Sequence, residues 1–321
     1  MKTHLQRSSI VLIFFAASLL SFAGEAPPPL FQQGLEQVRD GKFRQAMETA
    51  ATLEKSFPKQ PFAAVIAFES DWGLIYCQTG HINSREIWNL ADKKTSSYDK
   101  RFFDAIQLAL DLSRETRRNP ASAGAGALYE GLAHGARSRL YALREQGLSS
   151  ASEAKQMRAD MMETVAKDPQ LEPEASLGLG SYNYYADALS PILKLFRVFL
   201  GFPGGNRNKG LEQLRSSSAK SALLGDQAKF ELARILGVRE GRHSEAFILF
   251  QELTARYPEN PLFALSAAYQ AEGDGQQSAA VEYARKAQEA AAKSEADCRE
   301  RFIEASKGAL DRMQATKPAG K

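Results

Sequence analysis

The sequence predicts an all-α protein built as an array of antiparallel helix hairpins, and three observations lead to that prediction. Residues that favour helices dominate the chain after residue 29, and runs of alternating β-branched residues are missing. Glycine and proline fall between segments of helical apolar periodicity, where helix breaks are expected. Two segments near opposite ends of the chain also share one pattern of residues at the same spacing.

The shared pattern covers residues 40–61 and 240–261. In both segments an acidic residue, a glycine and a basic residue are followed by an alanine, a leucine and an aromatic–proline pair at matching positions. The matched residues are Gly41, Ala46, Leu53, Phe57 and Pro58 in the first segment and Gly241, Ala246, Leu253, Tyr257 and Pro258 in the second. A looser third copy places Gly275 and Ala280 34 residues after their counterparts. A period of 34 residues is that of tetratricopeptide repeats.

Each position of the pattern has a steric reason. We expect the glycines in the turn between two helices, where a positive φ or a close approach is needed. The alanines are expected where the two helices pack closest, and the prolines end the second helix. Stacked hairpins bury the apolar faces that a single hairpin leaves open. The pattern therefore predicts a tetratricopeptide-like α-α superhelix, a right-handed solenoid of antiparallel hairpins with a concave groove.

Between the first and last copies the pattern weakens. We expect helices over residues 99–117, 124–144, 154–168 and 174–185. Small residues recur at helical spacing in the second of these, which indicates a tightly packed helix; they are Gly124, Ala127, Gly131 and Gly135. The number of hairpins in this region stays open.

Residues 1–23 predict a cleaved secretory signal peptide. Lys2 and Arg7 precede an apolar run from Ile10 to Leu20, which is about half the length needed to span a bilayer. Small residues at Ser21 and Ala23 then form a cleavage site. The alternative is an uncleaved anchor. Residues 24–29 are expected to be a stiff linker, residues 30–312 the repeat domain and residues 313–321 a disordered tail, so we expect an exported protein.

Charge and cysteine content limit the partners. The whole chain has a formal net charge of +3, to which Lys2 and Arg7 of the leader contribute. The rest is nearly neutral and has no general attraction for nucleic acid. Cys77 and Cys298 are the only cysteines. They either pair in an oxidising compartment or remain two separate small apolar residues, and a solenoid that keeps its ends apart favours the second alternative.

One composite pattern lies in residues 174–215. It comprises the run from Gly178-Leu179-Gly180 to Tyr184-Tyr185, then Pro191, the turn Pro203-Gly204-Gly205-Asn206-Arg207 and the pair Gly210-Leu211. The pattern resembles exported bacterial tetratricopeptide proteins related to the tetratricopeptide repeat protein 39 family. Asn206 stands where that family usually has aspartate. The resemblance implies a helical-repeat fold in a bacterial periplasm, and it brings no catalytic residues.

The sequence contains no pattern typical of an enzyme. His81, His134 and His243 are far apart, and none belongs to a metal-binding motif. Residues 201–210 are rich in glycine but lack a P-loop. There, Asn206, Arg207 and Lys209 either hold an anion at a helix start or form a capped turn. We therefore expect no catalysis, no metal and no cofactor.

Two segments are candidates for binding a partner. Three neighbouring tyrosines cannot all point into one helix–helix interface; they are Tyr182, Tyr184 and Tyr185. At least one of them either faces the groove, where it could bind a partner, or fills the space left by the neighbouring glycines. Residues 191–202 are apolar on almost every side of a helix, which predicts either a core helix or a docking surface for a protein or a membrane face. The candidate residues in that segment are Lys194, Phe196, Arg197 and Phe199. The expected function is that of a protein-binding scaffold in the cell envelope, and the alternative is a membrane-associated factor that docks through residues 191–202.

Overall fold

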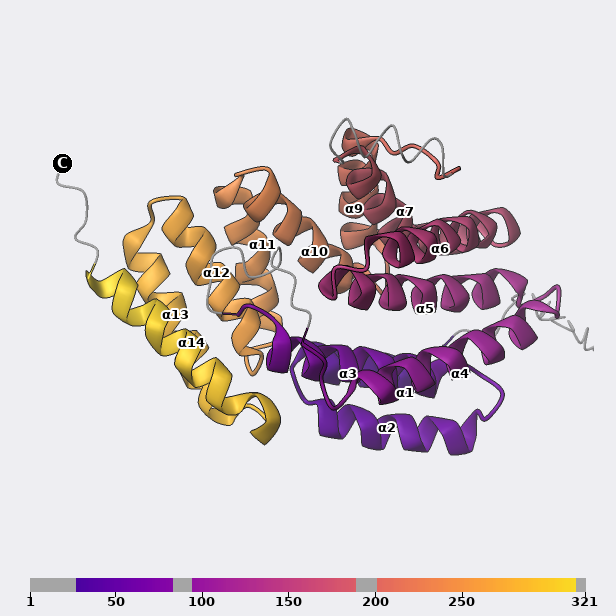
Figure 1. The fold of residues 1–321 in the computed structure, drawn as a ribbon, viewed down its shortest axis with the longest axis horizontal. Helices are drawn as coiled ribbons and strands as arrows, with labels where there is room; N and C mark the ends of the chain where they lie inside the picture. Colours follow the sequence, from indigo (N-terminus) through magenta and orange to yellow (C-terminus); the bar gives the residue numbers. More distant parts are fainter. Residues whose placement is uncertain (1–26, 83–93, 189–200, 316–321) are drawn as a thin grey trace, which may run out of the picture.

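The computed structural model describes residues 27–82, 94–188 and 201–315. Every regular element within these ranges is a helix, which confirms the predicted all-α class for this part of the chain. Each described helix packs against the next one along the chain (Figure 1). The helices are α1 (Pro29–Arg39), α2 (Phe43–Ser56), α3 (Phe62–Thr79), α4 (Asp99–Arg117), α5 (Ala123–Leu143), α6 (Gly147–Lys167), η1 (Pro169–Leu171), α7 (Glu172–Asp187), α9 (Arg207–Lys220), α10 (Gly225–Arg234), η2 (Ile235–Arg239), α11 (His243–Arg256), α12 (Pro261–Gly273), α13 (Gln277–Lys293) and α14 (Ala296–Ala315).

The repeat positions have the conformations that the sequence predicts. The turns before α2, α11 and α13 contain Gly41, Gly241 and Gly275, whose φ angles are +76°, +65° and +74°. These values lie in the left-handed region, which a side chain disfavours. The alanines of the pattern are fully buried, and α2 and α11 both end shortly before the prolines of the pattern; these residues are Ala46, Ala246, Ala280, Pro58 and Pro258.

The middle helices also follow the prediction, with one difference. α4, α5 and α7 lie within a few residues of their predicted bounds. α6 begins at Gly147 rather than at residue 154, because its serine-rich first turns continue the helix. The glycines of α5 allow α6 to approach closely: a Cβ added at Gly124 or Gly131 would lie 2.7 Å from Asp168 Cβ or 2.8 Å from Met161 Cε. The tightly packed helix predicted here is confirmed.

The two ends of the described chain meet. Cys77 of α3 and Cys298 of α14 form a disulfide, with their Cα atoms 5.5 Å apart. The Arg301 guanidinium donates hydrogen bonds to the carbonyls of Cys77 and Gly80, at 2.6 and 2.8 Å. The N-terminal helix α3 consequently lies beside the yellow C-terminal helix α14 (Figure 1). The expectation that the ends stay apart is therefore wrong, because long-range polar contacts and the disulfide join them.

A second set of contacts joins the α1–α2 turn to the turn before α12. Asn260 Nδ2 donates to the carbonyl of Arg39 at 2.6 Å, and the Lys42 ammonium lies 3.3 Å from the carboxylate of Glu259. The backbone N–H of Arg44 donates to Glu295, which precedes α14, at 2.6 Å. The array is therefore closed at a second place besides the disulfide.

α3 is the helix on which both halves of the molecule pack. Ile66, Phe68 and Ile75 belong to the core formed with α1, α2, α4 and α5. Leu74 and Tyr76, in the C-terminal part of α3, belong to the core formed by α11–α14. α3 is apolar on nearly all sides for this reason, and its buried residues outnumber the rest.

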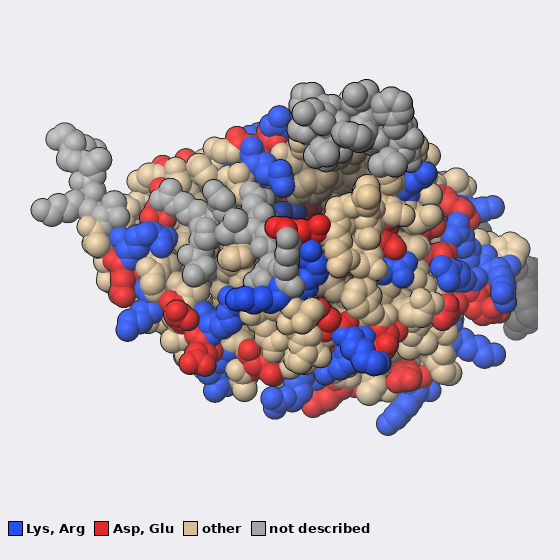
Figure 2. Space-filling model, viewed as in Figure 1, with Lys and Arg blue, Asp and Glu red and all other residues tan. Residues whose placement is uncertain are grey.

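The outer surface carries both signs of charge. Lysine, arginine, aspartate and glutamate are interspersed over the visible face, without a large region of one sign (Figure 2). None of the described helices has the length and apolar character needed to cross a bilayer. α14 continues to Ala315, past the boundary predicted at residue 312. The predicted signal peptide lies outside the described residues.

Candidate binding surface

α7 is positioned by two glycines that let its neighbours approach. A Cβ added at Gly180 would lie 2.9 Å from the carbonyl oxygen of Gly210 in α9, and one at Gly178 would lie 2.9 Å from Met161 Cγ in α6. Glu172 and Glu174 in the first turn suit the positive end of the helix dipole. α7 is thus clamped between α6 and α9 along its first half. Its three tyrosines follow in the second half.

Each of these tyrosines has a guanidinium over its ring, supplied by a different part of the chain. Arg158 of α6 lies 5.5 Å from the ring centroid of Tyr182, and Arg207 of α9 lies 6.0 Å from that of Tyr184. Arg234 and Arg239 lie 5.5 and 5.2 Å from the ring centroid of Tyr185. Such cation–π contacts favour the guanidinium over the ring face. We call these residues the tyrosine–arginine surface: Arg158, Tyr182, Tyr184, Tyr185, Arg207, Arg234 and Arg239.

The tyrosines differ in how far they are covered. Tyr182 and Tyr184 are buried, and their hydroxyls donate to the carbonyl of Pro203 and to the Glu240 carboxylate. Tyr185 is half-buried, and its hydroxyl accepts a hydrogen bond from Arg234. The first two tyrosines therefore have a structural role in this conformation. Tyr185 is the one that keeps an accessible face.

A π-helical turn brings two arginines to the same tyrosine. Arg234 and Arg239 are five positions apart, and in an α-helix this spacing would separate their directions by about 140°. η2 widens the helix here, with the N–H of Glu240 donating to the carbonyl of Ile235 at 3.1 Å. In a π turn, position i+5 returns to nearly the same face as position i. The turn therefore explains why both guanidiniums reach Tyr185.

Two of the arginines are held by carboxylates. Arg207 binds Glu240 through two hydrogen bonds, one of them 2.7 Å long, and Arg234 binds Glu231 at 2.7 Å. Burial alone would raise the pKa of Glu240 and of Glu231, but the paired guanidiniums bring each pKa below its ordinary value. Burial, with the hydrogen bond to Glu240, raises the pKa of Tyr184 to about 12. At neutral pH these groups form ion pairs and a neutral phenol, which suits recognition better than proton transfer.

Arg158 and Arg239 differ from the other two arginines. Within the part of the chain that the structure describes, neither guanidinium has a carboxylate partner. Each guanidinium instead lies over a tyrosine ring. Arg239 is exposed and Arg158 is half-buried. The guanidinium N–H groups of these two residues are therefore available for a partner that supplies hydrogen-bond acceptors.

The surface continues onto α3 and α5. Arg139 of α5 lies 5.0 Å from the ring centroid of Trp72 and 2.6 Å from the carboxylate of Glu69. Burial raises the pKa of Glu231, and Arg234, the hydrogen bond of Tyr185 and then the charge of Arg139 lower it. Sequence reasoning missed Trp72 and Arg139, as it did Arg158, Arg234 and Arg239. Their positions relative to α7 depend on the packing of separate helices.

The glycine-rich turn before α9 forms a helix cap. The Asn206 side chain accepts a hydrogen bond from the N–H of Lys209 at 2.9 Å. The N–H of Arg207 donates to the carboxylate of Asp187 at 3.1 Å. The chain's own side chains thus occupy the start of α9, where an anion would bind. The other predicted candidates, Lys194, Phe196, Arg197 and Phe199, lie outside the described residues.

The histidines are separate from this surface. His134 Nδ1 lies 2.6 Å from the Glu153 carboxylate, and His243 Nδ1 lies 2.9 Å from the side-chain oxygen of Gln270. In residues 27–82, 94–188 and 201–315 no three His, Cys, Asp or Glu side chains are placed to hold a metal ion. Neither family models nor the sequences of curated proteins give a match to this chain.

Proposed function

We propose that this chain is an exported, non-enzymatic helical-repeat protein of the tetratricopeptide type that holds a protein partner. The 34-residue spacing of the repeat positions and the positive φ of Gly41, Gly241 and Gly275 support the repeat assignment. The superhelical arrangement and the kinship with the exported bacterial proteins named above are parts of the same proposal.

The binding role rests on Arg239 beside Tyr185 and Arg158 beside Tyr182, neither of which has a carboxylate partner within the described residues. Aromatic and arginine side chains dominate the energetics of protein interfaces, because they bury large areas and donate several hydrogen bonds. On this surface the tyrosine rings hold the guanidiniums in place, so that less conformational entropy is lost when a partner binds. Arg239 is exposed, so a partner can reach its guanidinium.

The disulfide supports export. Structural disulfides persist in oxidising compartments and are rare where thiols are kept reduced. Cys77 and Cys298 are each only 1% exposed, which is typical of a bond that stabilises the fold. Together with the predicted leader, this favours a periplasmic or otherwise extracytoplasmic location.

Site-specific cross-linking tests the binding role. A photoreactive amino acid is placed at position 239 in the full chain, and a matched one at position 285, an exposed arginine of α13. After illumination in the protein's own cell envelope, we expect a covalent protein adduct from position 239 and none from position 285. Equal adducts at both positions, or none at either, would count against this surface as the partner site.

A further inference from the structure

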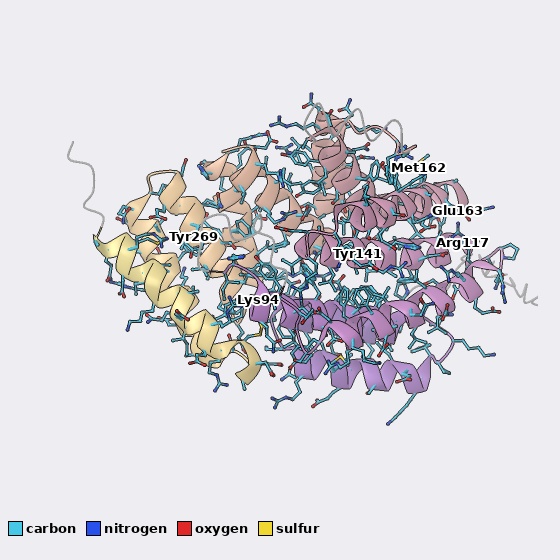
Figure 3. All side chains as sticks on the ribbon, in the orientation of Figure 1. Lys94, Arg117, Tyr141, Met162, Glu163 and Tyr269 are labelled. Carbon is cyan, nitrogen blue, oxygen red and sulfur yellow. A yellow bond between two sulfur atoms is a disulfide. The ribbon has the colours of Figure 1, made fainter. Side chains whose placement is uncertain are left out.

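A separate group of charged side chains is packed between α4, α5 and α6. We call it the α4–α6 cluster; its members are Arg114, Arg117, Glu130, His134, Arg137, Glu153, Asp160 and Glu163. Arg117 lies at its centre, 2.6 Å from the Glu130 carboxylate and 3.1 Å from that of Asp160. Arg117, the last residue of α4, also binds Glu163 of α6, and the two residues lie close together in Figure 3.

The remaining members extend the network along α5. Arg114 donates to the second oxygen of Glu130 at 2.9 Å. Glu153 of α6 lies 2.9 Å from the Arg137 guanidinium and 2.6 Å from His134 Nδ1. All the carboxylates of α6 in this network therefore point toward α4 and α5 and hold α6 against them.

The cluster is short of one positive charge. It contains three arginines and four carboxylates, and the imidazole of His134 contributes no charge when neutral. At the exposed rim, Asp111 contacts Arg114 and Lys167 lies near Glu163, and these opposite charges cancel. A buried charge without compensation is costly, so a site of this kind favours taking up a proton.

The geometry shows where such a proton would reside. Asp160 is 7% exposed, and its Oδ1 accepts a hydrogen bond from Arg117. Its Oδ2 is buried and accepts no hydrogen bond within the described part of the chain. His134 Nε2 lies 3.9 Å from this oxygen, while Nδ1 of the same ring is engaged by Glu153.

We infer that the α4–α6 cluster is a proton-binding site, in which one proton on Asp160 Oδ2, facing His134 Nε2, tightens α6 against α5. The protonated carboxyl group of Asp160 donates to Nε2, and Nδ1 of the same ring stays with Glu153. The cluster thereby becomes neutral, and α5 and α6 are joined by one more hydrogen bond.

The surroundings of Asp160 support this site. Burial, and next the charge of Glu130, raise the pKa of Asp160 to about 6, although His134 and Arg117 act in the opposite direction. α7, which also packs on α6, contributes no charge at this point but places Gly178 against Met157 and Met161. The charged groups that face Asp160 therefore come from α4, α5 and α6 itself.

The sign of the pH dependence follows. Asp160 keeps its proton up to about pH 6 in the folded chain and loses it near its ordinary value of 3.8 when unfolded. Its contribution to stability is fully present below the ordinary value and is lost as the pH rises through 6. Arg117 lowers the pKa of Glu163, and His134 and Arg137 lower that of Glu153 against the effect of burial. The contributions of Glu163 and Glu153 to stability have the opposite sign and are lost only at lower pH. The titration of Asp160 therefore determines how stability changes between pH 5 and 7.

Equilibrium unfolding at several pH values tests the inference. We expect the unfolding constant of the wild-type chain to rise by about tenfold between pH 5 and 7 relative to that of Asp160→Asn, since the asparagine cannot titrate. The exposed carboxylate of Asp104, on α4, provides the control, and Asp104→Asn should keep the wild-type pH dependence. Equal pH dependence in wild type and Asp160→Asn would overturn the inference.

Two measurements on the wild-type chain apply even if Asp160→Asn does not fold. The carboxyl ¹³C resonance of Asp160 should titrate with a midpoint near pH 6, and a midpoint near 4 would contradict a proton held on Asp160 Oδ2. Amide hydrogen exchange in α6, corrected for the intrinsic effect of pH, should slow by several fold on going from pH 7 to pH 5. Unchanged or faster exchange at pH 5 would refute the tightening of α6.

Discussion

Removing the disulfide between Cys77 and Cys298 should produce a large loss of stability. The bond joins residues 221 positions apart, and the chain-entropy relation for a loop of that length gives about 5 kcal/mol at 25 °C. Strain or residual structure in the unfolded chain reduces this value, so it is an upper estimate. It is still comparable with the whole stability of many domains.

The assay is guanidinium unfolding of the oxidised chain, the reduced chain and the double variant Cys77→Ser/Cys298→Ser, followed by helical circular dichroism. We expect the reduced chain and the double variant to unfold at similar, much lower denaturant concentrations than the oxidised chain. Alkylation after unfolding should modify two cysteines only when a reductant is present. Alkylation of both cysteines without reductant, or equal midpoints for the three samples, would refute the reasoning.

Three further predictions concern α7 and α14. Gly180→Ala should lower the free energy of unfolding by about 1–3 kcal/mol, because the added methyl group meets the carbonyl of Gly210 in α9. Gly308→Ala, in α14 with nothing near the added Cβ, should instead stabilise by roughly 0.5–1 kcal/mol, and chemical denaturation of the pair distinguishes the two sites. Tyr184→Phe should remove a phenol that titrates near pH 12 and lower stability by about 1 kcal/mol, through loss of its bond to Glu240. Ultraviolet titration of wild type and variant checks the first effect, and an unchanged number of late-titrating tyrosines would contradict it.

The repeat positions could be predicted because their requirements are local. A tight turn needs a positive φ, and a close helix pair needs a small side chain, so Gly41 and Ala46 show the same pattern as Gly241 and Ala246. The bounds of α4 could be predicted for a similar reason, since Asn119 and Pro120 follow the helix directly. Local signals of this kind do not depend on the rest of the fold.

Closure of the array could not be predicted in that way. Two cysteines so far apart in sequence carry no information about distance in space, and an ideal solenoid would separate them. The composition of α3 contained the only available signal: a helix that is apolar on all sides requires neighbours on all sides. The neighbours of α3 include α14, which lies far along the sequence.

The candidate surface was predictable only in part. The tyrosines of α7 are adjacent in sequence, so they could be recognised as a group. The arginines that cover them come from α6, α9, α10 and η2, and a π turn determines the direction of Arg239. Neither the packing of these helices nor the extra residue in the turn has a periodic signature.

Closure around α3 also determines the order in which the protein can mature. The C-terminal part of α3, with Leu74 and Tyr76, is completed by α11–α14, which are synthesised last. This apolar part has no native cover until the final helices have been synthesised, so native folding is completed only after them. A chain that is shortened before α14 would leave the same part of α3 without its full native cover and open to chaperones and proteases.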